Sequence, residues 1–450
     1  MKRNKEDFTW NDISVDKTGR TFSDENYFYR GIYNYKSQEI RIKKMFSSGL
    51  IDNLVKKELI LPIEITDIEF NNVNEYSLVL KSEKIRNIIY PTEWSFTMLF
   101  DAAQLMIRLE KELLSYEYTL HDFHPYNIVF KGTQPFFCDI GSLFIRQSNS
   151  EKLFCQAMIE KYYRPLYVWR TQGKSSTNLY LFNDLGIEDA EWKKWIIGEV
   201  CIGKKEHLLE VFKMKKNVSI DTMSGWFGSL KDFSRSMEKG HWNWSDYQDE
   251  YFNNEGEIVL SDRFYKIINI LKKYNIRNIT ELASNMGVLS EYCLKNDIVD
   301  YSLAVDYDEW AVDKMYNRLK GNGLSNRITT GVVDLVEPRC KDALKSRNRM
   351  KNECVLALAV IHHLTLSQGM TFDSVVDMLS DYSLRYVIVE FMPLGLYARH
   401  AGFSMSDIPK EYNLDNFIKA FTNKFDILEE EQIELNRILF VGEKKINNKK

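Results

Sequence analysis

From Asp262 to the C-terminus, short apolar runs alternate with segments of helical periodicity. Runs such as Asn278–Leu282 and Tyr301–Val305 are mostly apolar, which is typical of parallel strands that are buried on both faces. Alternation of such strands with helices predicts an α/β fold, with a parallel sheet that helices cover on both sides. Two final strand-like runs, Phe425–Leu428 and Arg437–Gly442, are separated by a short polar segment and predict a hairpin added at one edge of this sheet.

The earlier part of the chain has a different pattern, and 450 residues are enough for two or three domains. We expect an α+β domain over residues 21–143, followed by a mainly helical region over residues 144–240 that belongs to the same half. A polar and aromatic stretch predicts a linker over residues 241–262. The strand–helix alternation then forms the last domain, over residues 263–445.

Charge and cysteine content argue against several classes of protein. Sixty Lys and Arg residues against 64 Asp and Glu residues give a formal net charge of −4, which disfavours a basic surface for nucleic acid. The six cysteines have no CxxC or other metal-like spacing, so we expect reduced thiols and no bound metal. No run approaches the roughly 20 apolar residues of a membrane span, and the charged N-terminus lacks the apolar run of a signal peptide. We therefore expect a cytoplasmic protein, and the sequence does not indicate its oligomeric state.

Polar residues follow the apolar strands of the last domain at the ends where a ligand binds in an open parallel sheet. After the first strand, Ala283 and Gly287 are small enough for a ligand to approach the backbone closely, and Asn285 tolerates a positive φ angle. The second strand ends at Asp306, where a carboxylate can accept both hydroxyls of a ribose. The third strand leads to Asp334, which can accept a hydrogen bond from an adenine amine. For any one of these residues, capping of the next helix is the simpler interpretation.

The segments ELASNMG, LAVDYDE, GVVD and CVLALAVIHHL occur in this order and spacing. They resemble class I S-adenosylmethionine-dependent methyltransferases, and specifically their nodulation-protein-like branch. The resemblance implies a seven-stranded Rossmann-like sheet with an antiparallel last strand and S-adenosylmethionine over the turn after the first strand. The cofactor-binding residues that it implies are Glu281, Ala283, Ser284, Asn285, Gly287, Asp306, Tyr307, Asp334, Leu335 and Ala359.

A dehydrogenase is the competing interpretation of such a sheet. Its first turn would need the pattern G-x-G-x-x-G, and this chain has Ala283 and Asn285 where the first two glycines belong. The dehydrogenase motif also has no role for Asp334. The methyltransferase interpretation is therefore favoured.

Three residues are candidates for the base that removes a proton from an acceptor hydroxyl. His362 and His363 follow the fourth strand, and neutral imidazole suits proton abstraction near pH 7. Glu390, at the end of the fifth strand, is the third candidate. The alternatives are that a histidine packs or caps the next helix and that Glu390 forms a salt bridge.

The N-terminal half contains a second motif. Asp122 and Asn127 are five residues apart, as are the Asp and Asn of a kinase catalytic loop, and Asp139-Ile140-Gly141 lies where a metal-binding Asp-Phe-Gly would be expected. This half resembles the kinase and aminoglycoside-phosphotransferase fold. It lacks a glycine-rich phosphate loop, and Lys43, Lys44 or Lys81 would have to supply a phosphate-binding amine.

Together these features predict an S-adenosylmethionine-dependent methyltransferase that acts on a hydroxyl of a glycan or other small molecule. The kinase-like domain, possibly degenerate, is expected to position the acceptor. Two alternatives stay open. One is a bifunctional kinase–methyltransferase that uses ATP and Mg²⁺ in its N-terminal domain, and the other is a non-catalytic nucleotide-binding adaptor.

Overall fold

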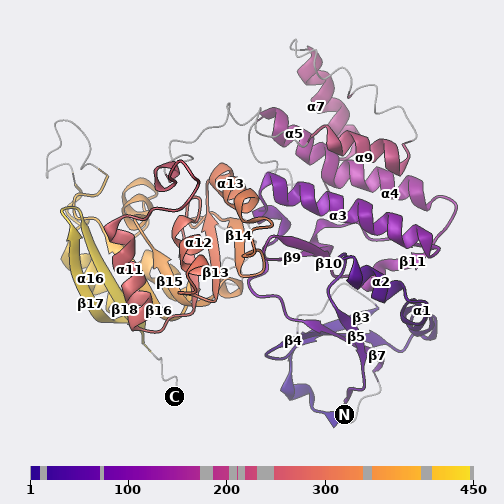
Figure 1. Cartoon of the computed structure of the whole chain (residues 1–450), viewed down its shortest axis with the longest axis horizontal. Coiled ribbons are helices and arrows are strands. Elements are labelled where there is room, and N and C mark those ends of the chain that lie inside the picture. The colour runs from indigo at the N-terminus through magenta and orange to yellow at the C-terminus, as the bar shows by residue number, and fades with distance from the viewer. Residues whose placement is uncertain are drawn as a thin grey trace. The chain divides into compact units, whose positions relative to one another are not determined.

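The computed structural model describes residues 2–10, 18–70, 75–172, 186–201, 210, 218–230, 248–337, 347–396 and 408–445 (Figure 1). The chain forms two compact units. The N-terminal unit consists of residues 1–86, 98–131 and 135–236, and the C-terminal unit of residues 87–97, 132–134 and 237–450.

The C-terminal unit is built on a seven-stranded sheet in which strands of different sequence order are neighbours. The first five strands are parallel, whereas the last strand in sequence is antiparallel to both of its neighbours. The predicted hairpin is present, but its second strand is inserted next to the parallel strands. Across the sheet the order is β14 (Ile328–Val332), β13 (Tyr301–Asp306), β12 (Asn278–Leu282), β15 (Asn352–Ala357), β16 (Ser383–Phe391), β18 (Arg437–Lys444) and β17 (Phe425–Glu434). This order and polarity confirm the Rossmann-like methyltransferase fold.

Helices cover both faces of this sheet. Successive side chains of a strand point to opposite faces, and on β18 they pack against different helices. Leu439 and Val441 of β18 belong to the core cluster that is formed with three of the helices. Phe440, between them, instead packs on Phe417, with ring centroids 5.2 Å apart. The helices of the first face are α11 (Asp262–Lys273), α12 (Val288–Lys295) and α13 (Glu309–Leu319), and those of the second are α15 (Phe372–Tyr382) and α16 (Leu414–Phe421).

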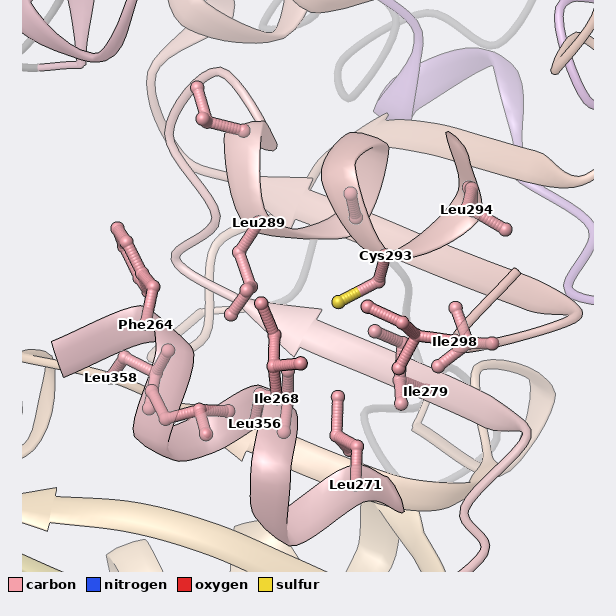
Figure 2. Close-up of a cluster of buried hydrophobic side chains, with 14 of the residues drawn as sticks. Phe264, Ile268, Leu271, Ile279, Leu289, Cys293, Leu294, Ile298, Leu356 and Leu358 are labelled. Carbon is pink, nitrogen blue, oxygen red and sulfur yellow. The ribbon is translucent and has the colours of Figure 1, made fainter. Parts of the chain in front are cut away.

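The core on the first face is apolar and closely packed. Figure 2 shows Ile268 and Leu271 of α11 and Leu289 and Cys293 of α12 pointing toward Ile279 of β12. All five side chains are almost completely buried. Removal of each large aliphatic side chain from water contributes about 1.5–3 kcal/mol, so the core fixes both helices against the strand that leads into the candidate site.

Two short segments from the first third of the chain belong to the C-terminal unit, although the predicted domain over residues 21–143 includes both. In the first, residues 87–97, the Asn87 side chain donates to the backbone oxygen of Arg349 over 3.0 Å. Glu93 is almost fully buried and pairs with the Arg349 side chain at 2.6 Å. Breaking a buried ion pair of this kind is strongly destabilising, which makes this segment an integral part of the unit.

The two segments also contact α13 and the loop that follows it. Thr97 donates through its backbone N–H and its hydroxyl to the carboxylate of Asp313, each over 2.8 Å. In the second segment, residues 132–134, the backbone oxygen of Thr133 accepts from the Tyr316 hydroxyl at 2.8 Å. The Thr133 N–H donates to the backbone oxygen of Ser325 at 2.9 Å.

The N-terminal unit begins with an antiparallel five-stranded sheet of order β2 (Thr9–Trp10), β3 (Gly19–Ser23), β4 (Tyr27–Tyr33), β7 (Tyr76–Glu83) and β5 (Ile63–Thr66). A short strand, β1 (Lys2–Arg3), pairs with β6 (Glu69–Phe70). Aromatic residues form the core of the sheet, where Phe22 stacks on Tyr29 with ring centroids 5.3 Å apart. Helices α1 (Lys36–Ser47) and α2 (Leu50–Lys56) lie between β4 and β5 in the sequence.

The second part of the N-terminal unit is mainly helical. Its longest helix among the described residues is α3 (Phe96–Ser115), and β9 (Ile128–Lys131) pairs with β10 (Gln134–Phe137). Strand β8 (Tyr118–Leu120) pairs with β11 (Leu143–Ile145). Of the predicted helical region over residues 144–240, the described part contains α4 (Ser150–Met158), a π-helix (Ile159–Tyr163), α5 (Arg164–Gln172), α7 (Asp189–Cys201) and α9 (Ile220–Gly228). None of the helices described in either unit is both long enough and apolar enough to cross a membrane.

Candidate functional site

The turn from β12 to α12 has an unusual backbone. Ala283, Asn285 and Gly287 have φ angles of 52°, 51° and 64°, all in the left-handed region. A side chain makes this conformation unfavourable, and non-glycine residues that adopt it are concentrated at functional sites. At Gly287 a Cβ atom would lie 2.3 Å from the sulfur of Met315 on α13, and this close approach and the positive φ both favour glycine there.

Hydrogen bonds from outside hold this turn in its conformation. The Ser284 N–H donates to the backbone oxygen of Val305 at 3.0 Å, and the Asn285 N–H donates to Oδ2 of Asp306 at 2.6 Å. Arg318 of α13 donates to the backbone oxygen of Met286 at 2.5 Å. The shape of the turn is therefore imposed by the neighbouring elements.

Ser284, within this turn, carries a buried hydroxyl. The side chain is 1% exposed, and its Oγ has no hydrogen-bond partner among the described residues. A buried polar group without a partner is costly. A ligand over the turn would supply the missing partner.

Asp306, the last residue of β13, lies opposite this turn. Besides Asn285, the backbone N–H of Asp308 donates to its carboxylate, to Oδ1 at 2.8 Å. Burial raises the pKa of Asp306 to about 6, although hydrogen bonds from the backbone N–H groups of Asp308, Asn285 and Tyr307 lower it. A carboxylate offers about four acceptor positions, so these bonds leave capacity for a ribose hydroxyl.

The neighbouring strand ends complete one edge of the sheet. Asp306 of β13 is paired in register with Val332 of β14, and Asp334 follows two residues later. Oδ1 of Asp334 accepts from the backbone N–H groups of Val336 and Glu337 at 2.9 and 3.1 Å. Of the other two predicted residues here, Tyr307 is 46% exposed and Leu335 is buried.

Strand β15 brings Ala359 to the same edge, because β15 pairs in parallel with β12 and Ala357 lies opposite Leu282. Ala359 has a φ of 51°, the same left-handed conformation as Ala283. The structure thus places the strand-end residues expected from the sequence at four neighbouring strands. Polar residues at several strand ends, together with the left-handed backbone at Ala283, Asn285 and Ala359, fit a nucleoside cofactor at this edge.

Glu281 has a different environment from the other predicted cofactor residues. Its carboxylate is buried and accepts from the hydroxyl and the backbone N–H of Ser290 on α12. The Ser302 hydroxyl donates to Ser290 in turn, at 2.8 Å. Burial raises the pKa of Glu281 to about 7. This geometry favours a role in fixing α12 beneath the turn.

The two candidate histidines lie at the start of a π-helix, His363–Ser367, and their ring centroids are 4.2 Å apart. His362 is 6% exposed, and its Nδ1 has no partner among the described residues. Burial, with the nearby charges of His363 and Arg437, lowers the pKa of His362 to about 3. Burial also lowers the pKa of His363, which is only partly buried. His362 is therefore a neutral hydrogen-bonding group with very weak basicity, and His363 is the stronger base.

Glu390 is completely buried between two arginines. Arg263 of α11 donates to both carboxylate oxygens, over 2.5 and 3.0 Å, and Arg437 of β18 donates over 2.9 Å. Protonation of this carboxylate would leave two buried guanidinium groups without their partner. The expectation that Glu390 acts as a base does not fit this geometry, which indicates a structural link between α11, β16 and β18.

In the N-terminal unit the three residues of the kinase-like motif have unequal surroundings. Asp122 is exposed, and its Oδ1 accepts from the backbone N–H of His124 at 3.0 Å. The Nδ2 atom of Asn127 is buried and has no partner among the described residues. Asp139 accepts from the Gly141 N–H at 3.1 Å and forms an ion pair with Arg30 of β4.

The pair between Arg30 and Asp139 bears on the Mg²⁺ ion that the bifunctional kinase–methyltransferase alternative would require. The guanidinium group contacts the carboxylate that would have to bind Mg²⁺, so the residues as placed do not fit a metal ion at Asp139. Lys43 and Lys81, expected as phosphate-binding amines, instead pair with the surface carboxylates of Glu39 and Glu64. Arg30 is the cation of this site; its one sequence signal is that it is the single charged residue within the aromatic strand Tyr27–Tyr33.

No group of three or more His, Cys, Asp or Glu side chains that could hold a metal ion occurs within the described ranges.

Comparison with known proteins gives one clear sequence relative. The chain is 24% identical to the nodulation protein NoeA of Rhizobium meliloti (strain 1021) over 376 residues, which covers 77% of each protein. No protein-family model matches the chain.

Solved structures that are similar to the chain include several methyltransferases. The methyltransferase domain of a bacterial Hen1 is 20% identical, with 41% of this chain and 97% of that one covered and a TM-score of 0.32. Magnesium protoporphyrin IX methyltransferase from Synechocystis PCC 6803, solved with S-adenosylmethionine, is 13% identical, with 46% and 99% covered and a TM-score of 0.31. The N-methyltransferase NodS from Bradyrhizobium japonicum WM9 is 10% identical, with 41% and 99% covered and a TM-score of 0.29. The fold assignment itself rests on the strand order of the sheet.

Proposed function

We propose that the protein is an S-adenosylmethionine-dependent methyltransferase that transfers a methyl group to a hydroxyl of a glycan or another small molecule. The observation that carries this proposal is the turn after β12. It combines three left-handed residues, a buried hydroxyl of Ser284 that has no partner among the described residues, and the carboxylate of Asp306 bonded to its backbone. Such a turn exposes backbone and polar atoms to a nucleoside ligand at the carboxyl ends of the strands.

The residues at this edge fit the parts of the cofactor. Asp306 would hold the ribose hydroxyls, Asp334 would accept from the adenine amine, and Ser284 would bond to the part of the cofactor above the turn. Tyr307, exposed beside Asp306, would contact the adenosine moiety. When bound, S-adenosylmethionine supplies an electrophilic methyl group on its sulfonium sulfur.

The histidines would serve the acceptor. As the bond from the hydroxyl oxygen to the methyl carbon forms and the sulfur–carbon bond breaks, the hydroxyl proton has to leave. His363 would take this proton because its imidazole is neutral near pH 7 and more basic than that of His362. His362, buried with an unpartnered Nδ1, would orient the acceptor by a hydrogen bond.

The N-terminal unit would position the acceptor and not phosphorylate it. The ion pair with Arg30 occupies Asp139, and kinase chemistry would require that carboxylate to be released to a metal ion. Exposed Asp122 and the buried, unpartnered Nδ2 of Asn127 remain as polar groups that a hydroxylated molecule could bond. A bifunctional kinase–methyltransferase is therefore the less favoured alternative, and a non-catalytic adaptor would bind S-adenosylmethionine poorly.

Isothermal titration calorimetry of the full chain with S-adenosylmethionine, and separately with ATP and Mg²⁺, tests this function. We expect binding of the first and none of the second. Gly287→Ala should weaken cofactor binding because its Cβ would displace the Met315 side chain at a left-handed position, whereas Gly256→Ala is a matched control at a left-handed glycine with open space around it. Absence of S-adenosylmethionine binding to the wild-type protein would refute the proposal.

A further inference from the structure

We infer that Gln248 is a positioning residue for the cofactor turn and that the five residues from Gln248 to Phe252, here called the strap, form part of the cofactor site. This inference rests on the proposed function. Nothing in the local sequence around Gln248 resembles a cofactor motif. Its role follows from what its carboxamide contacts.

Gln248 is 6% exposed and bonds to the turn at two points. Its Nε2 donates to the backbone oxygen of Ser284 at 3.2 Å, and its Oε1 accepts from the backbone N–H of Val288 at 3.3 Å. The two contacts bracket the segment that contains left-handed Asn285 and Gly287. One side chain thus joins the two ends of the turn.

The bond to Val288 replaces a missing helix cap. Val288 is the first residue of α12, and the residue before it is Gly287, which has no side chain to accept from the first N–H groups of the helix. Glycine is favoured at this position because of its positive φ and the nearby Met315 sulfur. Acceptors for the first N–H groups must therefore come from elsewhere in the chain: Gln248 accepts from Val288, and Glu281 accepts from Ser290.

The rest of the strap is anchored to the helices around the turn. Asp249 pairs with Lys314 of α13 at 3.3 Å, and the Tyr251 ring lies 5.3 Å from that of Phe264 on α11. Arg318 stacks on the Phe252 ring, with its guanidinium carbon 4.9 Å from the ring centroid.

Arg318 is also the residue that donates to the backbone oxygen of Met286. Its Nε pairs with the buried carboxylate of Glu291 on α12 at 2.7 Å. The strap therefore restrains the turn in two ways. Gln248 bonds to it directly, and Phe252 packs against Arg318, which bonds to Met286. A turn with strained left-handed residues needs such restraints to keep one conformation in the absence of ligand.

Two measurements on Gln248→Ala test the inference. Hydrogen exchange at the Gly287 and Val288 amides should accelerate relative to wild type, because the cap of α12 is lost. S-adenosylmethionine binding should weaken by about 5- to 20-fold, as expected for two neutral hydrogen bonds. Gln248→Glu, which keeps the acceptor for Val288 but loses the donor to Ser284, should give an intermediate exchange rate at Val288.

Gln432→Ala is the matched control. Gln432 is exposed on β17, and its Nε2 likewise bonds to two backbone oxygens, those of Glu434 and Leu435. It should change neither the exchange of the turn amides nor cofactor affinity. Unchanged exchange and unchanged affinity in a folded Gln248→Ala protein would overturn the inference while leaving the proposed function intact. If the wild-type protein bound no cofactor, the proposed function would fail, and the exchange data alone would decide whether Gln248 holds the turn.

Discussion

The backbone N–H of Asn285 donates to Oδ2 of Asp306 at 2.6 Å. This bond joins the turn that follows β12 to the last residue of the neighbouring strand, β13. The carboxylate that we expect to hold the cofactor's ribose thus also fixes the turn over which the cofactor is expected to lie. On the proposed function, ligand binding and the conformation of the turn would be linked through this one side chain. Substitution of Asp306 removes both contributions at once.

Asp306→Ala should weaken S-adenosylmethionine binding by about 1.5–3 kcal/mol, the scale of hydrogen bonds to a charged group. Calorimetry measures this effect, and circular dichroism checks that the variant is folded. Asp377→Ala is a suitable control because Asp377 is exposed on α15 and pairs only with Lys424 in the described contacts. Wild-type affinity in a folded Asp306→Ala protein would remove Asp306 from the cofactor site.

Glu281 should make the free energy of unfolding depend on pH between about 4.5 and 7. Its pKa rises from 4.5 to about 7 on folding because of burial, so the folded protein retains a proton that the unfolded chain releases. Stability from this group is complete below pH 4.5 and is lost as the pH rises to 7, by about 2–3 kcal/mol. Urea unfolding of Glu281→Gln and wild type at several pH values measures the difference, which should shrink toward zero at low pH if the sign is right.

The rate of methyl transfer should already be independent of pH above about 6.5. The pKa of His362 falls to about 3 and that of His363 is also lowered, both by burial, so neither imidazole gains a proton in that range. His363→Gln should reduce turnover by about 10²–10⁴-fold as a missing general base. His362→Gln should reduce it less. An inflection above pH 6.5 that disappears in His362→Gln would reverse the two roles.

Glu390→Gln should destabilise the protein by about 3–5 kcal/mol, because it leaves Arg263 and Arg437 buried with a neutral partner. Glu443→Gln offers a comparison on β18, where an exposed pair with Arg385 is worth about 1 kcal/mol or less. Denaturant unfolding reports both values. A Glu390→Gln protein of normal stability that had lost turnover would restore Glu390 as a catalytic candidate.

Asp122→Asn and Asp139→Asn should leave methyl transfer nearly unchanged if the N-terminal unit is a scaffold. Arg30→Met, which releases Asp139 from its ion pair, should still give no binding of ATP with Mg²⁺ by calorimetry. Strict dependence of methylation on ATP would contradict this view and make the N-terminal unit a working kinase.

The sequence predicted the parts of the structure that depend on local pattern. The strand-end residues Ala283, Asn285, Gly287 and Asp306 follow apolar runs, so their place at one edge of the sheet could be inferred from the chain alone. The salt-bridge alternative stated for Glu390 could not be tied to particular partners, because Arg263 and Arg437 are distant in sequence and have no local signature. Gln248 was missed for the same reason, since its contacts to Ser284 and Val288 arise only from tertiary packing.

The segments 87–97 and 132–134 have a consequence for how such a protein can arise and be inherited. A single recombination event between the halves of the gene, at any codon after 134, would leave the methyltransferase half without Asn87, Glu93 and Thr97. The recombinant would lose the buried contacts to Arg349 and Asp313. Selection should therefore keep the two halves together as one inherited piece, and exchange of either half with another gene should be rare among functional descendants.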